Sequence, residues 1–123
     1  MAGYIITTSV SNLGKIKYGD IWLITRAGKD IPGTRRVKSL APSHSLFRQY
    51  FTEWRHTDPK QWWELYKHEF NQGLQAPEAI GRLRELWSLV VKYEKVIVLA
   101  CYCRNESYCH RSLVGAFLLN QGV

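Results

Sequence analysis

Hydrophobic residues follow two different periods along the chain, and each period predicts its own kind of element. Short runs rich in β-branched residues predict strands at 4–10, 21–25 and 96–101. The second and third runs are continuously apolar, which is typical of parallel strands buried on both faces. A weaker run at 15–18 would add a fourth strand to the sheet.

Apolar residues at helical spacing predict helices in most of the remaining chain. Each predicted helix begins at a capping residue or a proline, namely Ser43, Asp58 with Pro59, Pro77 and Ser107. Gly73 is predicted to end the helix that begins at Asp58, and the last helix is predicted to run from 108 to 120. Residues 26–39 contain two glycines and a proline and predict a loop.

Strands that alternate with helices indicate an α/β fold. We expect a small parallel or mixed sheet of three to four strands flanked by helices, because a right-handed crossover places helices on a parallel sheet. A chain of 123 residues is the usual size of one domain, so a single α/β domain over residues 1–123 is predicted.

The charge of the chain favours an anionic partner. The formal net charge is +7, and a basic protein attracts nucleic acids or anionic small molecules. The segment 26–38 carries five basic residues and one acid. A modest basic excess that only aids solubility remains the alternative interpretation, and nothing in the sequence decides the oligomeric state.

Cysteine use and hydropathy predict a reduced, cytoplasmic protein with no membrane partner. The three cysteines lie at 101, 103 and 109, whereas a secreted scaffold uses an even number spread along the chain. The longest apolar run, 96–101, is too short to span a bilayer. The N-terminus has no signal-peptide pattern.

The segment 101–111 holds the densest chemistry in the sequence. It follows a buried strand and enters a helix, and that edge of an α/β sheet is where ligands bind. Helix N-terminal N–H groups attract anions and favour a thiolate at Cys109. Cys109 and His110 are the predicted catalytic residues, although neighbours on a helix point about 100° apart, which weakens a Cys–His pair. Arg111 is predicted to bind an anion, with Arg104 and Cys103 as further contacts, whereas Cys101 is predicted to be a small core residue.

Common cofactor and metal patterns are absent from the sequence. The cysteine and histidine spacing C-x-C-x5-C-H matches no usual zinc pattern, so no metal site is predicted. The segment 28–34 looks like a phosphate-binding loop but lacks its Lys-Ser/Thr pair, and no dinucleotide fingerprint occurs. We therefore predict no cofactor. Trp54, Trp62 and Trp63 fit either a core stripe or base-stacking platforms.

Several of these stretches resemble one protein family. Residues 40–48 and 56–62, together with Cys101 to Cys103 and the Cys-His-Arg sequence at 109–111, are similar to motifs of the YeaO-like branch of the domain-of-unknown-function 488 family. The similarity covers residues 21–118. It implies a compact α/β fold with a small parallel sheet, and it implies little about activity.

One position departs from the pattern of that family. Relatives carry an acidic residue and an arginine at the end of the second strand, and here Thr25 and Arg26 occupy these positions. If the acid is catalytic in relatives, its loss predicts a weakened or binding-only member. The resemblance also implies that Arg26 and the Cys-His-Arg segment face each other and form an anion pocket.

These patterns lead to three functional hypotheses. The first is an enzyme-like protein that binds a phosphorylated or carboxylated ligand, preferably a nucleotide or a nucleic-acid end, through Arg26 and Arg111. The second is a nucleic-acid-binding module that uses the loop residues Arg35, Arg36 and Lys38. The third is a thiol redox protein in which Cys103 and Cys109 form a disulfide.

Overall fold

The computed structural model describes residues 3–26, 28–102 and 106–120, and it contains a four-stranded sheet. Every strand pair in this sheet is parallel, and the strands lie in the order β1-β4-β2-β3. The strands are β1 (Tyr4–Ser9), β2 (Asp20–Leu23), β3 (Thr34–Arg36) and β4 (Val96–Cys101). The prediction of a small parallel α/β sheet is confirmed, and the carboxyl ends of all four strands share one edge.

The fourth strand lies where the sequence predicted a loop. β3 pairs with β2 after a connection without a helix, and the backbone continues the pairing as Val37 N–H donates to Leu23 O at 2.9 Å. The predicted strand at 15–18 is not formed: Lys15 ends the 3-10 helix η1 (Val10–Lys15), and residues 16–18 have no regular structure. A three-residue strand with two arginines has too few apolar positions to show a period of two.

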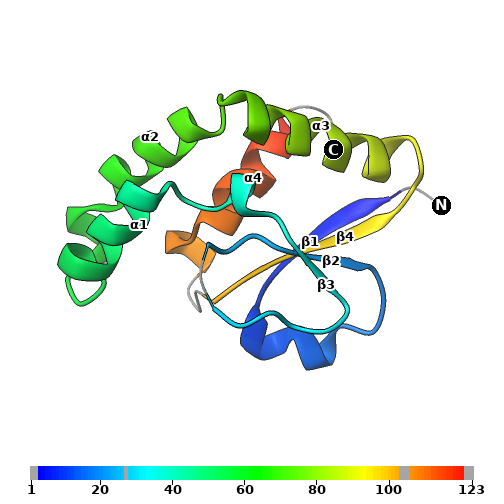
Figure 1. Cartoon of the computed structure of the whole chain (residues 1–123), viewed down its shortest axis with the longest axis horizontal. Coiled ribbons are helices and arrows are strands. Elements are labelled where there is room, and N and C mark those ends of the chain that lie inside the picture. The colour runs from blue at the N-terminus through cyan, green and yellow to red at the C-terminus, as the bar shows by residue number, and fades with distance from the viewer. Residues whose placement is uncertain (1–2, 27, 103–105, 121–123) are drawn as a thin grey trace.

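Four α-helices lie in the part of the chain that the structure describes. They are α1 (His44–Gln49), α2 (Trp63–Gly73), α3 (Pro77–Val91) and α4 (His110–Leu119). Two predicted caps are confirmed: Ser43 Oγ accepts a hydrogen bond from the backbone N–H of Leu46, and the Asp58 carboxylate accepts one from Lys60 N–H. Asp58 caps a short 3-10 helix, Pro59–Gln61, and α2 begins only at Trp63, so the predicted helix from Asp58 to Gly73 is divided. Figure 1 shows α2, α3 and α4 on one side of the sheet and η1 on the other. None of the described helices has the length and apolar character that crossing a bilayer requires.

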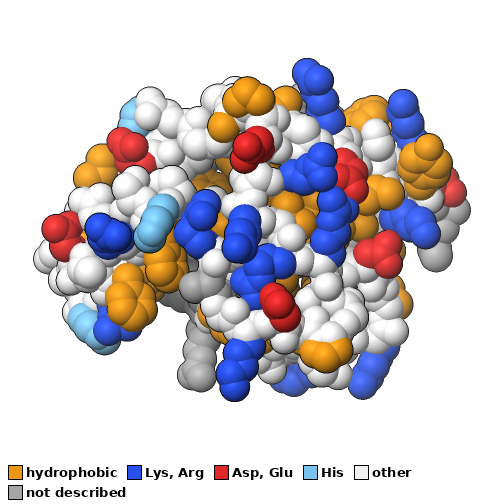
Figure 2. Space-filling view, in the orientation of Figure 1, with side chains coloured by type: hydrophobic (Ala, Val, Ile, Leu, Met, Phe, Trp, Pro, Cys, Tyr) orange, Lys and Arg blue, Asp and Glu red, His pale blue; other side chains and the backbone are white. Residues whose placement is uncertain are grey.

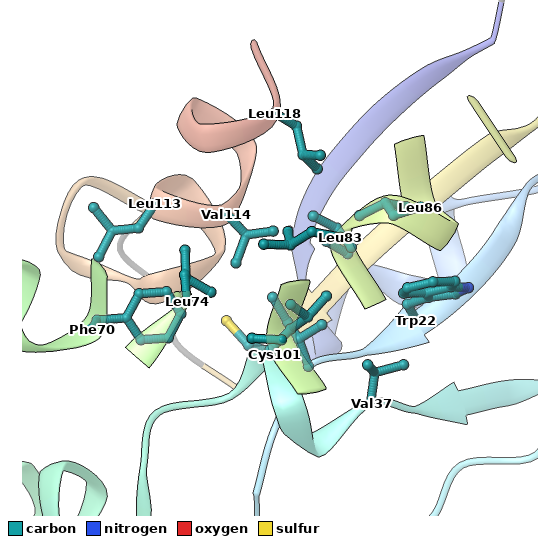
Figure 3. Close-up of a cluster of buried hydrophobic side chains, with 14 of the residues drawn as sticks. Trp22, Val37, Phe70, Leu74, Leu83, Leu86, Cys101, Leu113, Val114 and Leu118 are labelled. Carbon is teal, nitrogen blue, oxygen red and sulfur yellow. The ribbon is translucent and has the colours of Figure 1, made fainter. Parts of the chain in front are cut away.

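The main core lies between the sheet and these helices. Figure 3 shows side chains from β2, β4, α2, α3 and α4 that meet in one cluster. β4 is central, and its residues from Ile97 to Cys101 are fully buried because both faces of the strand are covered. Cys101 belongs to the cluster, as the sequence predicted, and its sulfur points toward the side where Phe70 lies (Figure 3).

The connection between β2 and β3 is held by one arginine. The Arg36 guanidinium donates to the Asp30 carboxylate, to the Thr25 hydroxyl and to the carbonyls of Thr25, Gly28 and Lys29. Gly28 has a φ of +105°, and a Cβ there would lie 2.5 Å from the Tyr102 ring. A glycine is therefore required for Tyr102 to pack across this connection.

The last helix begins later than its sequence pattern predicted. A 3-10 turn, η5 (Glu106–Tyr108), precedes α4, and the N-cap is Cys109 in place of the predicted Ser107. Cys109 has an extended backbone with φ −130° and ψ 143°. Helical periodicity does not describe the direction of a side chain on extended backbone. The angle between the Cys109 and His110 side chains therefore differs from that between neighbours on a helix.

Candidate functional site at the carboxyl edge of the sheet

A pocket of about 360 Å³ opens where the strands β2 and β4 end. Thr25, Arg26 and Gly28 line it from the connection after β2, and Tyr102 lines it from the end of β4. His110 contributes from the first turn of α4. The pocket therefore lies at the edge where parallel α/β sheets bind ligands.

The pocket walls are mostly aromatic. Six aromatic rings line the pocket, and they are Phe47, Tyr50, Phe51, Tyr66, Tyr102 and Tyr108. Tyr66 and Tyr50 also contact each other edge to face, with ring centroids 6.3 Å apart. Trp63 connects Tyr66 to a further ring of the wall, because it stacks on Tyr66 and meets Tyr108 edge to face. Contacts between aromatic rings, most of them from the segment between β3 and α3, therefore hold the pocket walls in place.

Arg26 brings positive charge to this apolar pocket. Its Nε donates to the carbonyl of Pro42 at 2.9 Å, which anchors the guanidinium at the pocket. Arg26 thus lies in the connection that follows β2. Arg111 does not share this surface: it is 4% exposed and is not among the residues that line the pocket. The resemblance implied that Arg26 and the Cys-His-Arg segment face each other. His110 of that segment lines the pocket together with Arg26, whereas Arg111 does not.

Arg111 instead contacts two sulfurs behind the pocket. Its Nη1 donates to Cys101 Sγ at 3.2 Å and approaches Cys109 Sγ at 3.8 Å. The two sulfurs are 2.8 Å apart, and both cysteines are at most 1% exposed. Because a guanidinium keeps its charge in proteins, this buried cation favours negative charge on the thiols.

His110 connects the pocket to this buried cluster. Its Nε2 donates to the carbonyl of Ile24 at 2.5 Å, and its Nδ1 lies 3.8 Å from Cys109 Sγ. A carbonyl only accepts hydrogen bonds, so the proton of the neutral ring is on Nε2 and Nδ1 is an acceptor. Burial lowers the pKa of His110, and the nearby Arg111 adds to this effect, while Cys101 and the Ile24 hydrogen bond oppose it. His110 is thus held neutral with Nδ1 directed at a thiol.

The geometry corrects the expected separation of Cys109 and His110. The sequence predicted that the two side chains point about 100° apart, as neighbours on a helix do. Cys109 lies outside the helix with an extended backbone, and its sulfur reaches His110 Nδ1. Cys109 itself is buried and does not line the pocket, whereas His110 does. Cys103 and Arg104 lie outside the described residues.

Three of these side chains offer ligand atoms of the kind that soft metals prefer. Cys101, Cys109 and His110 place two sulfurs and one ring nitrogen within 4.8 Å of one another. The same sulfurs contact the Arg111 guanidinium, and a second cation there would meet a like charge at short range. The arrangement suits a thiolate–arginine contact better than a metal ion.

The basic loop of the second hypothesis is largely engaged within the protein. Arg35 pairs with Glu85 and lies 4.7 Å over the Trp22 ring, and Arg36 holds the β2–β3 connection. Lys38 is exposed. Figure 2 shows Lys and Arg side chains gathered across the middle of this face, over the segment that carries β3. The patch exists, but two of its three predicted contact residues have internal roles.

Comparison with known families places the chain. A family model described as the active DUF488-N3 subclade matches residues 8–122. The chain belongs to the DUF488 family. This membership confirms the resemblance at the level of the family, and the match extends from the end of β1 through α4. Neither the curated proteins nor the solved structures contain a match to this DUF488 chain.

The aromatic walls of the pocket were not foreseen in the sequence. Phe47, Tyr50, Phe51 and Tyr66 lie in segments whose apolar spacing predicts helices, Tyr102 follows the predicted strand 96–101, and Tyr108 is the predicted start of the last helix. The available signal was the identity of the residues. Tyrosine has an apolar ring and a polar tip, so a stripe rich in tyrosine is typical of a face that borders a site.

Proposed function

We propose that this DUF488 protein is an enzyme-like protein that binds a nucleotide or a nucleic-acid end in the pocket at the carboxyl edge of its sheet. The observation that carries the proposal is the combination of six aromatic rings with the anchored cation Arg26 in one pocket. A simple anion such as phosphate has no flat apolar group that could stack on the aromatic walls. A ligand that joins a flat base to a phosphate has a complementary group for each part of the pocket.

The size and chemistry of the pocket support a ligand of this class. A volume of about 360 Å³ falls in the range of small-molecule sites. Stacking of a base on an aromatic side chain contributes about 1–3 kcal/mol to binding. An arginine such as Arg26 forms paired hydrogen bonds with phosphate or carboxylate oxygens, which adds orientation as well as attraction.

We assign the chemistry to His110 together with Cys109. His110 lines the pocket, and its Nδ1 is directed at Cys109 Sγ, so it can take the thiol proton as a general base. The subclade that matches the chain is described as active, and this description favours an enzyme over a binding-only member.

Calorimetry with adenosine 5′-monophosphate, adenosine and inorganic phosphate tests the proposal. We expect the nucleotide to bind at least about tenfold more tightly than either of its parts, because stacking and charge contacts both contribute. Arg26→Met should weaken nucleotide binding about tenfold and leave adenosine unchanged. Lys38→Met removes a nearby exposed charge and is the matched control, with less than about twofold effect.

Two results would reject the pocket. One is a nucleotide that binds no more tightly than phosphate alone. The other is a loss of nucleotide affinity on Lys38→Met as large as that on Arg26→Met, together with an oligonucleotide affinity that falls steeply with salt. This second result would favour the basic loop and the binding-module hypothesis. Thermal unfolding of each variant checks that the fold is retained.

A further inference from the structure

Two cysteine sulfurs meet in the core behind the pocket. Cys101 ends β4 and Cys109 is the N-cap of α4, so the end of a strand and the start of a helix bring them together. Their sulfur atoms are 2.8 Å apart, and neither side chain is more than 1% exposed. Both cysteines belong to the buried core cluster, so packing of the strand end against the helix start holds the two thiols next to each other.

The surroundings of these thiols differ from those of ordinary core cysteines. The Arg111 guanidinium donates to Cys101 Sγ and approaches Cys109 Sγ, and Arg111 is itself buried. A structural thiol in an apolar core is unreactive, whereas a neighbouring cation stabilises the thiolate, which is the reactive form. A buried arginine that contacts two sulfurs is therefore the arrangement of a reactive pair.

His110 gives the two sulfurs different roles. Its Nδ1 is an acceptor directed at Cys109, so Cys109 can transfer its proton to the ring. His110 also lines the pocket, so the residue that contacts Cys109 also contacts the space that a small molecule would enter. Cys109 is the sulfur placed for first attack, and Cys101 is placed to resolve the product.

We propose that Cys101 and Cys109 form a redox couple that hydrogen peroxide oxidises to an intramolecular disulfide. His110 accepts the Cys109 proton, and the thiolate attacks one peroxide oxygen. An S–O bond forms, the O–O bond breaks, and the leaving hydroxide takes the proton from His110 to give water. Cys101 Sγ then attacks the sulfenic sulfur, the S–O bond breaks, and hydroxide leaves with the Cys101 proton. Two thiols lose two electrons in total, and one peroxide becomes two waters.

This pairing differs from the one that the sequence suggested. The third hypothesis joined Cys103 to Cys109, and Cys103 lies outside the described residues. The sulfur in contact with Cys109 is that of Cys101, which the sequence interpreted as an inert core residue. The redox couple rests on the buried cluster and does not depend on the pocket binding a nucleotide.

Peptide mapping of the full-length, reduced protein tests the couple. The protein is treated with a small excess of peroxide, and the remaining thiols are alkylated in denaturant before digestion. Cleavage after Lys95, Arg104 and Arg111 puts Cys101 and Cys103 in one tryptic peptide and Cys109 in another. We expect these two peptides to be linked, with the alkyl group on Cys103.

Variants identify the bond and the role of the arginine. Cys103→Ser should leave the link intact, and Cys101→Ser should abolish it. Arg111→Met should slow disulfide formation about tenfold, since each unit of thiol pKa changes the thiolate population tenfold below the pKa. Arg111→Lys keeps the charge and should restore part of the rate. Thermal unfolding shows which variants are folded. Peptide mapping of the wild-type protein tests the disulfide even if a variant does not fold.

Several results would overturn the couple. One is a disulfide that joins Cys103 to Cys109. Another is alkylation of all three cysteines after treatment with excess peroxide. A third is a metal ion bound at one equivalent by the wild-type protein and lost in Cys109→Ser. The nucleotide calorimetry is unaffected by any of these outcomes, so failure of the redox couple is distinguishable from failure of the pocket.

Discussion

Replacing Trp62 with alanine is expected to lower the free energy of unfolding by about 4 kcal/mol. Trp62 is 4% exposed and lies at the centre of the aromatic cluster. Its ring stacks on Trp54 with centroids 5.6 Å apart and meets Tyr50, Trp63 and Tyr66 edge to face. The substitution would leave a cavity that this many rigid rings cannot fill. Urea unfolding followed by circular dichroism measures the loss.

The neighbouring tryptophan is the control for this substitution. Trp63 is half-buried, and its ring packs on Tyr66 and Tyr108 at the edge of the cluster. Trp63→Ala should therefore cost about half as much as Trp62→Ala. Trp62→Phe fills most of the volume and should cost less than about 1.5 kcal/mol. Equal losses for the two alanine variants would show that Trp62 is not the centre of the cluster.

Stability is expected to decrease as the pH falls below about 6.5, and His110 is the cause. Burial lowers the pKa of His110 in the folded protein below its ordinary value of 6.5, with Arg111 acting in the same direction. Cys101 on β4 and the hydrogen bond to the Ile24 carbonyl act in the opposite direction and do not reverse this shift. The unfolded chain then binds the proton first, so the stabilisation is full above the unfolded pKa and is lost as the pH falls toward the folded pKa. The slope reaches about 1.4 kcal/mol per pH unit.

Urea unfolding between about pH 5 and pH 8 measures this effect. His110→Gln retains an amide that can donate to the Ile24 carbonyl but has no titrating group, so its profile should be flatter over this range. His44 is exposed, and His44→Gln is the matched control with the wild-type slope. The salt-bridged Glu85, whose pKa is lowered by Arg35, loses its contribution only at more acidic pH. An unchanged acid slope in His110→Gln would contradict the buried neutral histidine.

The sequence predicted the elements whose signals are local. Ser43, Asp58 and Gly73 begin or end helical segments where expected, because capping depends on neighbouring residues alone. β4 was predicted residue by residue, since a central strand buried on both faces is continuously apolar. β3 was missed, because its three residues pair with β2 through the backbone and carry no hydrophobic period.

The candidate site was only partly predictable, for a different physical reason. The sheet edge and the residues Arg26 and His110 follow from the end of a strand and the start of a helix. The sequence paired Cys109 with Cys103, whereas the structure places Cys109 against Cys101. This contact depends on the extended backbone of the N-cap Cys109, which helical periodicity cannot indicate. Tyr66 borders the pocket while remaining in the core, so its apolar period carries no signal for the site.

The central claim is that a base and its phosphate enter the aromatic pocket, and NMR titration with adenosine 5′-monophosphate tests it most directly. Ring resonances of Tyr50, Tyr66 and His110 report on the pocket, and side-chain resonances of Arg35 and Lys38 report on the basic patch. We predict saturable shifts of the ring resonances, which Arg26→Met moves to higher nucleotide concentration, with little change at Arg35 and Lys38. Shifts confined to Arg35 and Lys38, with the ring resonances unchanged, would contradict the pocket.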